Sequence, residues 1–253
     1  MKKLFILILF IPCLCFAGAG IVGLSSVGNN NISGDETPPP AELCQGEELF
    51  CSDFETDVSW DTTTDPEDAA LTADGDWTDQ DSVNAINDTY SLSIRGGATV
   101  YVQKQFSETD EFYIEGWFRT PSDLTSWVGP IAVWDTGVSS TVFSLTTSTT
   151  TLKILHNGFT NDIATVSLST EYRIGIYYKQ ETVPTSSGDG ILRVWLRTDS
   201  SDFDAGDLEL NITNATTGNV NAAYIRFRGP GTGLINTIDD CVIKSGAPSW
   251  PTS

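Results

Sequence analysis

The chain has 253 residues, of which 34 are acidic, 13 are Lys or Arg and one is His, giving a net charge of −21. Such acidity repels the phosphates of nucleic acids, so we expect no nucleic-acid partner. The sequence also has no nucleotide-binding loop and no cluster of thiolate metal ligands. Its length fits one all-β domain that follows an export signal.

Residues 1–19 have the pattern of a signal peptide. Two lysines precede a mostly apolar stretch over 4–16, and small residues from Ala17 to Ala19 suit cleavage. We expect a secreted or cell-surface protein with no stable membrane span after cleavage. The alternative is an uncleaved anchor, because the apolar stretch continues to Leu24 and just reaches the roughly 20 residues that a span needs.

Residues 20–43 are predicted to be a linker. They are rich in Asn, Ser and Gly and contain Pro38-Pro39-Pro40, which stiffens an extended arm and cannot build a packed core. A disordered tail is one interpretation. The other is that Ile21–Val27 adds as a strand to the sheet of a neighbouring subunit, which would permit self-assembly.

From residue 44 to residue 248, apolar and polar residues alternate in short runs separated by Gly, Asn, Asp, Ser and Thr. This period of two is typical of strands that bury one face, and no segment has a convincing helical period. The pattern predicts an all-β fold, a two-sheet antiparallel β-sandwich, followed by a short tail over 249–253. Clear examples of the expected strands are Tyr90–Ile94, Thr99–Phe106, Phe112–Arg119, Val128–Trp134, Thr141–Leu145, Thr151–His156, Ala164–Ser167, Tyr172–Lys179, Gly190–Arg197 and Tyr224–Arg228.

Two segments near the ends of the predicted domain carry a family resemblance. The first is Leu49-Phe50-Cys51-Ser52-Asp53-Phe54-Glu55-Thr56, and the second is Ile235–Lys244, which contains an Ile-Asp-Asp sequence. With Asn87–Ile94 and the segments 172–178 and 188–196 between them, their order resembles secreted jelly-roll domains of the concanavalin A-like, laminin-G-like kind. The resemblance covers about residues 49–245 and implies a jelly roll whose first and last strands lie side by side. It identifies no ligand.

The resemblance also implies a structural calcium ion. Similar domains commonly bring the Glu of the opening Phe-Glu and an Asp of the closing pair to one ion. These map to Glu55 and Asp240, with Asp239 and Asp53 as further candidates. Clustered oxygen atoms are the ligands that Ca²⁺ prefers. The alternative is that these carboxylates accept hydrogen bonds from backbone N–H groups or lie on the surface.

Three cysteines follow the signal peptide, and export permits disulfides between them. A bond between Cys44 and Cys51 would close a small loop just before the fold, and this pairing is favoured. Cys241 would then be unpaired and buried. A bond between Cys51 and Cys241 stays open, because the resemblance places both on neighbouring terminal strands.

The alternation within the strands also predicts a ligand-binding face. Once the apolar sets are assigned to the core, Arg and aromatic residues lie on the outer faces, with seven of the eleven Lys and Arg residues beyond residue 19. If these strands share a sheet, that face suits an extracellular acidic polysaccharide, because aromatic rings stack on sugars and Arg binds carboxylate or sulfate. Ordinary polar residues paired across strands are the alternative. The candidate ligand-binding residues are Trp117, Arg119, Tyr177, Lys179, Arg193, Trp195, Arg197, Arg226 and Arg228.

Catalysis is not expected. The segment Tyr172–Gln180 is similar to a strand of alginate-lyase-like jelly rolls, but the single histidine, His156, lacks the Gln that precedes it by two residues in those enzymes. The Glu-x-Asp-x-x-Glu strand of related glucanases is also missing. The sequence therefore predicts a non-catalytic carbohydrate-binding or adhesion module. A structural subunit of a surface layer or filament is one alternative, and a polysaccharide lyase or glycoside hydrolase is another.

Overall fold

The computed structural model describes residues 44, 48–55, 58–63, 77–97, 99–125, 128–182, 188–218 and 220–252. The signal peptide and linker predicted over 1–43 lie outside these residues. Residues 40–253 belong to one compact unit. In the described part, no helix is long and apolar enough to cross a membrane.

Strands supply nearly all of the regular structure, as the period-two alternation predicts. One 3₁₀ helix, η1 (Ala205–Asp207), is present among the described residues. The strands are β1 (Phe50–Ser52), β2 (Thr62–Thr63), β3 (Trp77–Asp81), β4 (Ser91–Gly96), β5 (Tyr101–Thr109), β6 (Glu111–Arg119), β7 (Val128–Asp135), β8 (Thr141–Ser148), β9 (Thr151–His156), β10 (Phe159–Thr165), β11 (Glu171–Lys179), β12 (Gly190–Arg197), β13 (Leu208–Ala215), β14 (Ala222–Arg228) and β15 (Gly231–Ser245).

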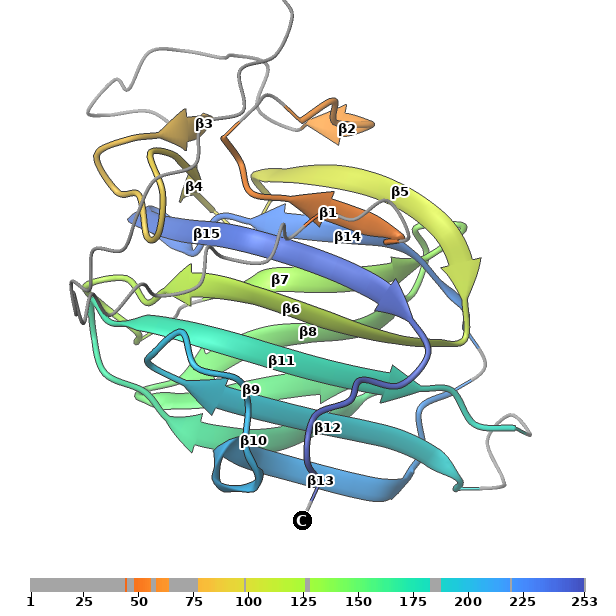
Figure 1. Cartoon of the computed structure of the whole chain (residues 1–253). Helices are drawn as coiled ribbons and strands as arrows, with labels where there is room; N and C mark the ends of the chain where they lie inside the picture. Colours follow the sequence, from red (N-terminus) through yellow and green to blue (C-terminus); the bar gives the residue numbers. More distant parts are fainter. Residues whose placement is uncertain are drawn as a thin grey trace, which may run out of the picture. The chain divides into compact units, whose positions relative to one another are not determined.

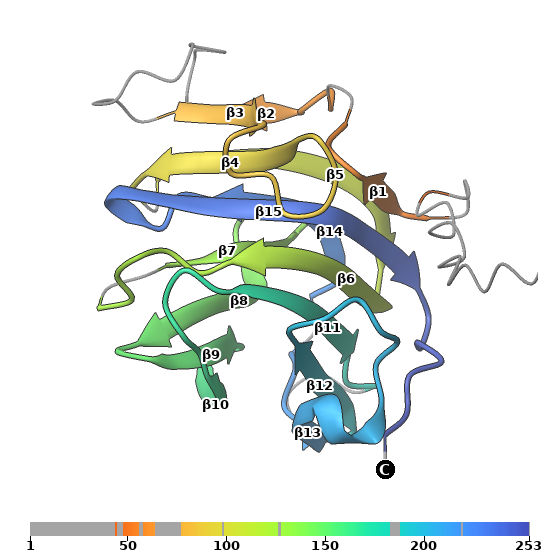
Figure 2. The same ribbon diagram turned by 60° about the vertical axis from the view of Figure 1, so that its left-hand side comes forward.

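The strands form two stacked antiparallel sheets (Figure 1, Figure 2). Sheet A has eight strands in the order β13-β12-β11-β6-β15-β4-β3, with β1 paired to β15 beside this path. Sheet B has seven strands in the order β10-β9-β8-β7-β14-β5-β2. This arrangement confirms the predicted all-β, two-sheet antiparallel sandwich.

The predicted strand list differs from the observed strands in several places, and the short strands β2 and β3 are among those it lacks. It omits β13, because the Asn and Thr residues of that strand are also typical of turns. It also places a strand at Ala164–Ser167, whereas β10 begins at Phe159 directly after the Asn157-Gly158 turn. Both turn residues have positive φ angles, 41° and 79°, as two-residue hairpin turns require.

The core lies between the sheets and is formed by alternate residues of both. Aromatic rings from the two layers meet there: Phe112 of β6 lies 5.4 Å from Tyr178 of β11 and 6.1 Å from Phe143 of β8, measured between ring centroids. The buried Tyr178 hydroxyl donates to the carbonyl of Thr217 at 2.9 Å. Burial of such rings dominates the stability of a sandwich core.

The first and last strands lie side by side, as the resemblance implies (Figure 1). Phe50 pairs with Ile243 and Ser52 with Cys241 across β1 and β15. Cys44 and Cys51 form a disulfide with a Cα separation of 5.6 Å, whereas Cys241 is a buried free thiol. The favoured disulfide is therefore confirmed.

Candidate functional site

The nine predicted ligand-binding residues do not share one sheet. Strands β6, β11 and β12 are neighbours in sheet A, but β14 pairs with β5 and β7 in sheet B. Arg226 and Arg228 therefore lie on the opposite side of the sandwich from the other seven residues. The condition for one shared face is therefore not met. Alternation assigns residues to the faces of a strand but does not assign a strand to a sheet.

Carboxylates neutralise the principal arginines on the outer face of sheet A. The Nε atom of Arg119 donates to Glu171 at 3.1 Å, and the Nε atom of Arg173 donates to Glu115 at 2.8 Å. Arg197 forms ion pairs with Asp199 and Asp207 at 2.8 and 2.9 Å. The hydrogen bond to Asp199 raises the pKa of Arg197. These guanidinium groups already have anionic partners.

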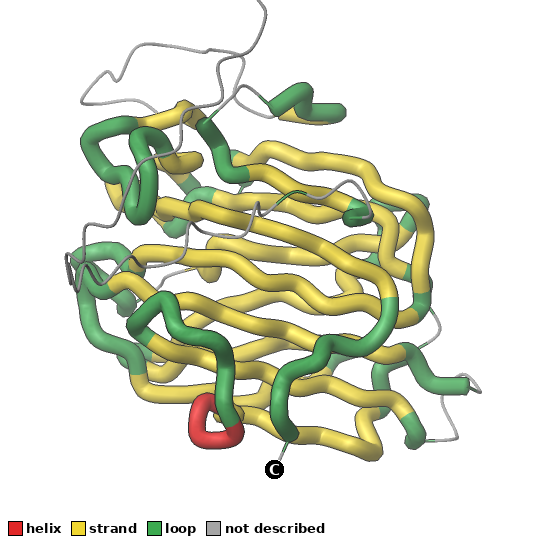
Figure 3. The backbone as a smooth tube through the Cα atoms, in the orientation of Figure 1, coloured by secondary structure: helices red, strands yellow, loops and turns green. Residues whose placement is uncertain are grey.

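The aromatic residues on this face are covered. Trp195 has no exposed surface. Its ring lies 5.2 Å from that of Trp250, which in turn lies 4.9 Å from Phe203, and its Nε1 donates to the carbonyl of Pro251 at 2.9 Å. Figure 3 shows the segment after β15 running across the strands of sheet A. The expected exposed platform is therefore a small second core.

Two other predicted residues are buried on this face. Trp117 and Tyr177 expose only 9% and 4% of their surface. The Tyr177 hydroxyl donates to Glu111 at 2.6 Å, and burial is the main cause that raises its pKa. Arg193 lies over the Tyr177 ring, 5.9 Å from its centroid, and donates to Asn211 at 3.0 Å.

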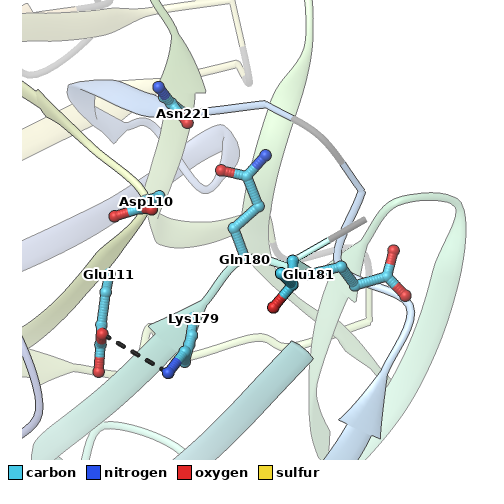
Figure 4. Close-up of a pocket in the computed structure, with 7 residues that line it drawn as sticks. Asp110, Glu111, Lys179, Gln180, Glu181 and Asn221 are labelled. Carbon is cyan, nitrogen blue, oxygen red and sulfur yellow. Dashed lines mark ion pairs between the residues drawn. The ribbon is translucent and has the colours of Figure 1, made fainter. Parts of the chain in front are cut away.

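Lys179 lies at the end of the sandwich, in a pocket of about 320 Å³ (Figure 4). Its Nζ is 3.8 Å from Glu111, and the carboxylate of Glu181 points away from this pair in the close-up. Three acids against one lysine, with no aromatic ring, make the pocket unsuitable for an anionic sugar. The pocket is lined by Asp110, Glu111, Lys179, Gln180, Glu181, Thr182 and Asn221.

The outer face of sheet B has a different arrangement, centred on Arg226. Its guanidinium carbon lies 4.1 Å from the centroid of the Tyr101 ring and 4.3 Å from that of Trp134. The Nε atom donates to the side-chain oxygen of the buried Gln103. Two aromatic rings and one amide thus hold the guanidinium, and its terminal nitrogen atoms have no hydrogen-bond acceptor among the described residues.

Arg228 lies two residues further along the same face. Its Nη2 donates weakly to the carbonyls of Gly129 and Leu145, at 3.4 and 3.2 Å. Its Nε is buried and has no hydrogen-bond partner in the described structure, and the same holds for Nε1 of Trp134. Buried donors without an acceptor are rare in folded proteins and require an explanation.

The electrostatics of this face favour an anion. Burial is the main cause that lowers the pKa of Arg228 to about 10, and the charge of Arg226 lowers it further. Burial also lowers the pKa of Arg226. Among the ion pairs of the described residues, none includes either arginine. An anionic ligand would relieve this repulsion between like charges.

The predicted calcium ligands gather around the segment Asn87–Ser91. One carboxylate oxygen of Glu55 accepts from two backbone N–H groups of this segment, at 2.8 and 2.7 Å. Asp240 accepts from the Asn87 side chain at 2.6 Å. Asp239 is fully buried and accepts from the Asn87 backbone and the Ser91 hydroxyl, at 3.0 and 2.8 Å. Both carboxylate oxygens of Asp239 are thereby occupied, because Oδ1 accepts from the next backbone N–H.

Asp240 has an unusual backbone conformation and environment. Its φ angle is 46°, a left-handed value, at a bulge in the pairing of β15 with β6. Burial is the main cause that raises its pKa to about 6, and the charges of Asp239, Asp88 and Asp53 contribute. In the described part of the chain, no group of three His, Cys, Asp or Glu side chains is arranged to hold a metal. A calcium ion here would therefore need amide or backbone oxygens as well.

His156 faces the core and is buried. Its Nε2 is 2.9 Å from Oδ1 of Asn161.

The sequence-predicted site lacks three residues that belong to the arrangement around Arg226, namely Tyr101, Gln103 and Trp134. The sequence signal for these residues was the alternation within β5 and β7. Along these strands they occupy the outward positions, which alternate with the buried Val102, Ile131 and Val133.

No protein-family model and no curated protein matches the chain. Among solved structures, the chain is similar to an endo-β-1,4-glucuronan lyase from the fungus Trichoderma reesei, with a TM-score of 0.52 and 13% identity over 74% of this chain and 91% of that chain. It is also similar to the cellulose-induced protein Cip1, with a TM-score of 0.53 and 15% identity over 81% and 99% of the two chains. At these identities the similarity shows a shared all-β sandwich fold. The narrower laminin-G-like assignment stays a prediction.

Proposed function

We propose that this protein binds an acidic polysaccharide on the outer face of sheet B, through Arg226. The observation that carries the proposal is the guanidinium held between the Tyr101 and Trp134 rings, with no carboxylate partner in the described residues. A fixed guanidinium binds a planar carboxylate through two parallel hydrogen bonds. The flanking rings offer apolar surface on which sugar rings stack.

Two buried donors add to the electropositive surroundings of Arg226. Nε1 of Trp134 and Nε of Arg228 are buried donors without acceptors, on both sides of Arg226. Because neither atom is exposed, they add partial positive charge beside Arg226 and do not contact a ligand directly. Because the chain itself is strongly acidic, this face would be a local exception that attracts an anion at short range.

Two solved neighbours also bear on the ligand class. One is named a glucuronan lyase and the other a cellulose-induced protein, so the same sandwich occurs in proteins whose names refer to polysaccharides. Our proposal is binding. Cleavage by a lyase is the alternative that the first neighbour suggests, and it is tested in the same experiment.

The decisive test is affinity electrophoresis against a panel of soluble polysaccharides. The panel contains polyuronates, a sulfated galactan and a neutral β-glucan. We expect retardation by an acidic polymer and none by the neutral one. The Arg226→Gln variant should lose at least roughly tenfold in affinity, because hydrogen bonds between charged groups contribute about 1.5–3 kcal/mol.

The matched control is Arg197→Gln, which makes the same substitution on sheet A, where the arginine already has two acidic partners. It should leave retardation unchanged. Equal behaviour of both variants, or equal retardation by neutral and acidic polymers, would refute the proposal. A rise in the ultraviolet absorbance of unsaturated uronates during incubation would instead show that the protein is a lyase.

We also propose that calcium binds between Glu55 and Asp240. Both carboxylates are anchored on one segment, Asn87–Ser91. Burial is the main cause that raises the pKa of Asp240, and the nearby charges of Asp239, Asp88 and Asp53 add negative charge that a cation would relieve. Carboxylate and amide oxygens fit a hard cation. If the ion binds, it stabilises the junction of the first and last strands and contributes no chemistry at the Arg226 face.

The test is thermal unfolding with calcium and with a chelator. Calcium should raise the melting temperature of the wild type and should have little effect on the Asp240→Asn variant. The matched control is Asp123→Asn, an exposed residue whose carboxylate contacts only the nearby Thr125. An unchanged melting temperature of the wild type would eliminate the calcium site without affecting the polysaccharide proposal.

A further inference from the structure

Among its described residues, sheet B offers a ligand one available cation. Its strands contain two lysines and two arginines. Each lysine forms an ion pair with an aspartate, Lys104 at 3.6 Å and Lys153 at 2.9 Å. Arg228 donates to two backbone carbonyls through Nη2, and its Nε is buried. Arg226 is therefore the cation of these strands that keeps exposed surface and has no protein acceptor at its terminal nitrogen atoms.

Access to Arg226 is local. Its pairing partners on the two neighbouring strands are covered, since Gln103 exposes 4% and Ala132 exposes 0% of its surface. Arg226 itself and the rings of Tyr101 and Trp134 are only half-buried. A ligand therefore meets this sheet at the guanidinium and its two rings, and does not lie along a track across the strands.

The free end of the guanidinium fits one carboxylate. Its Nε atom is occupied by the hydrogen bond to Gln103, and the two rings hold the group at 4.1 and 4.3 Å. Nη1 and Nη2 remain, and their N–H groups at the end of the planar fork match the two oxygen atoms of a carboxylate. A second carboxylate on the same ligand would find no further available cation among the described residues of the sheet.

The charge of the rest of the chain opposes a polyanion. The net charge is −21, and charges at the surface act over about 8–10 Å at ionic strengths of about 0.1–0.15 M. In a polyuronate every sugar unit carries a carboxylate, so the units next to the bound one lie within this range of an anionic surface. Their repulsion would offset part of the attraction to Arg226.

We infer that the Arg226 site takes an isolated carboxylate on an otherwise neutral glycan. This inference rests on the proposed function and specifies its ligand: an acidic polysaccharide whose uronate units are separated by neutral sugars. The neutral units beside the uronate contact the exposed parts of Tyr101 and Trp134. A densely charged polyuronate binds more weakly, although it offers more carboxylates.

The test is titration calorimetry with three oligosaccharides of equal length. The first has one uronate on neutral sugars, the second is the methyl ester of the first, and the third has a uronate at every position. At low salt, the first should bind at least roughly tenfold more tightly than either of the others. Added salt should strengthen binding of the third relative to the first, because salt screens the repulsion.

An added cation near Arg226 sharpens this comparison. Gln105→Lys places a charge on the exposed outer face of β5, about 8 Å from Arg226 between Cα atoms. It should raise the affinity for the fully charged oligomer at least about threefold, and should change the affinity for the single uronate less.

The matched control is Thr160→Lys, the same added charge on the same face of sheet B. Thr160 is exposed and lies four strands from Arg226, about 19 Å away and beyond the screening length. This variant should leave the affinities for all three oligosaccharides unchanged. Melting temperatures within a few degrees of the wild type show that both variants are folded.

The outcomes separate this inference from the proposed function. Suppose that Arg226→Gln weakens binding, but the fully charged oligomer binds as tightly as the single uronate at low salt, or the two lysine variants behave alike. The site then stands, and its restriction to isolated carboxylates is wrong. If the methyl ester binds as well as the acid, or if Arg226→Gln has no effect on any ligand, the proposed function itself fails.

Discussion

The two outer faces of the sandwich contain similar residue types in opposite arrangements. On sheet A, arginines pair with Glu115, Glu171 and Asp207, and the aromatic rings are buried under Trp250. On sheet B, Arg226 lies between two rings and has no carboxylate partner among the described residues.

An outer-face Arg or Trp is therefore not by itself a sign of ligand binding. On sheet A the Arg and Trp side chains have hydrogen-bond partners within the protein. Through these bonds they hold two chain segments against the sheet, the loop around η1 and the segment after β15. On sheet B the same residue types leave donors unpartnered. Unsatisfied hydrogen-bonding capacity, and not residue type, distinguishes the candidate site.

The largest expected effect is the loss of stability on replacing Trp195 with Ala. This ring has no exposed surface, so its removal should lower the free energy of unfolding by about 3–5 kcal/mol. The comparison variant is Trp134→Ala, at a partly exposed ring on sheet B, which should cost clearly less. Urea unfolding measures both. Equal losses would show that the two faces do not differ in structural role.

A second effect should follow from adding a methyl group to sheet A at Gly175. A Cβ atom there would lie 2.7 Å from the Trp250 ring and 3.0 Å from Phe203. Gly175→Ala should displace the covering segment and cost about 1–3 kcal/mol. Tryptophan fluorescence should shift to longer wavelength as Trp195 becomes hydrated. An unchanged spectrum would mean that the cover adapts without opening.

A third effect concerns binding and not stability. Trp134→Ala removes one ring beside Arg226, and a partly desolvated cation–π contact contributes about 1–2 kcal/mol, so affinity for the acidic polysaccharide should fall about tenfold. Trp250→Ala, on the other face, should leave the affinity as it was. Titration with the acidic polysaccharide measures the affinity of both variants. A loss of affinity in the Trp250 variant would indicate that the outer face of sheet A also binds the ligand.

The smallest effect is a pH dependence at the junction of the first and last strands. Because the pKa of Asp240 is raised to about 6, the folded state holds this proton more tightly than the unfolded state. In chelator, its contribution to stability should therefore increase as the pH falls from about 7 toward 4. Melting curves of the wild type and Asp240→Asn isolate this contribution. Calcium should cancel the trend, since it requires the ionised carboxylate.

The sequence was sufficient where local pattern decides the structure. Alternation in β6, β11 and β12 identified which residues face the core and which face outward, and two nearby cysteines indicated the Cys44–Cys51 disulfide. The opening and closing motifs correctly paired the first and last strands. Glu55 and Asp240 were expected near each other, and both contact the segment Asn87–Ser91.

Only the tertiary structure decided which outward residues act together. The partner sheet of β14 depends on long-range packing, so the sequence could not separate Arg226 and Arg228 from the arginines of sheet A. It also could not show that Trp250, more than fifty residues after Trp195, covers that ring. By itself the sequence determined most of the strands and the two faces of each, because alternation is local. The sheet to which each face belongs, and what covers it, depended on contacts between distant segments.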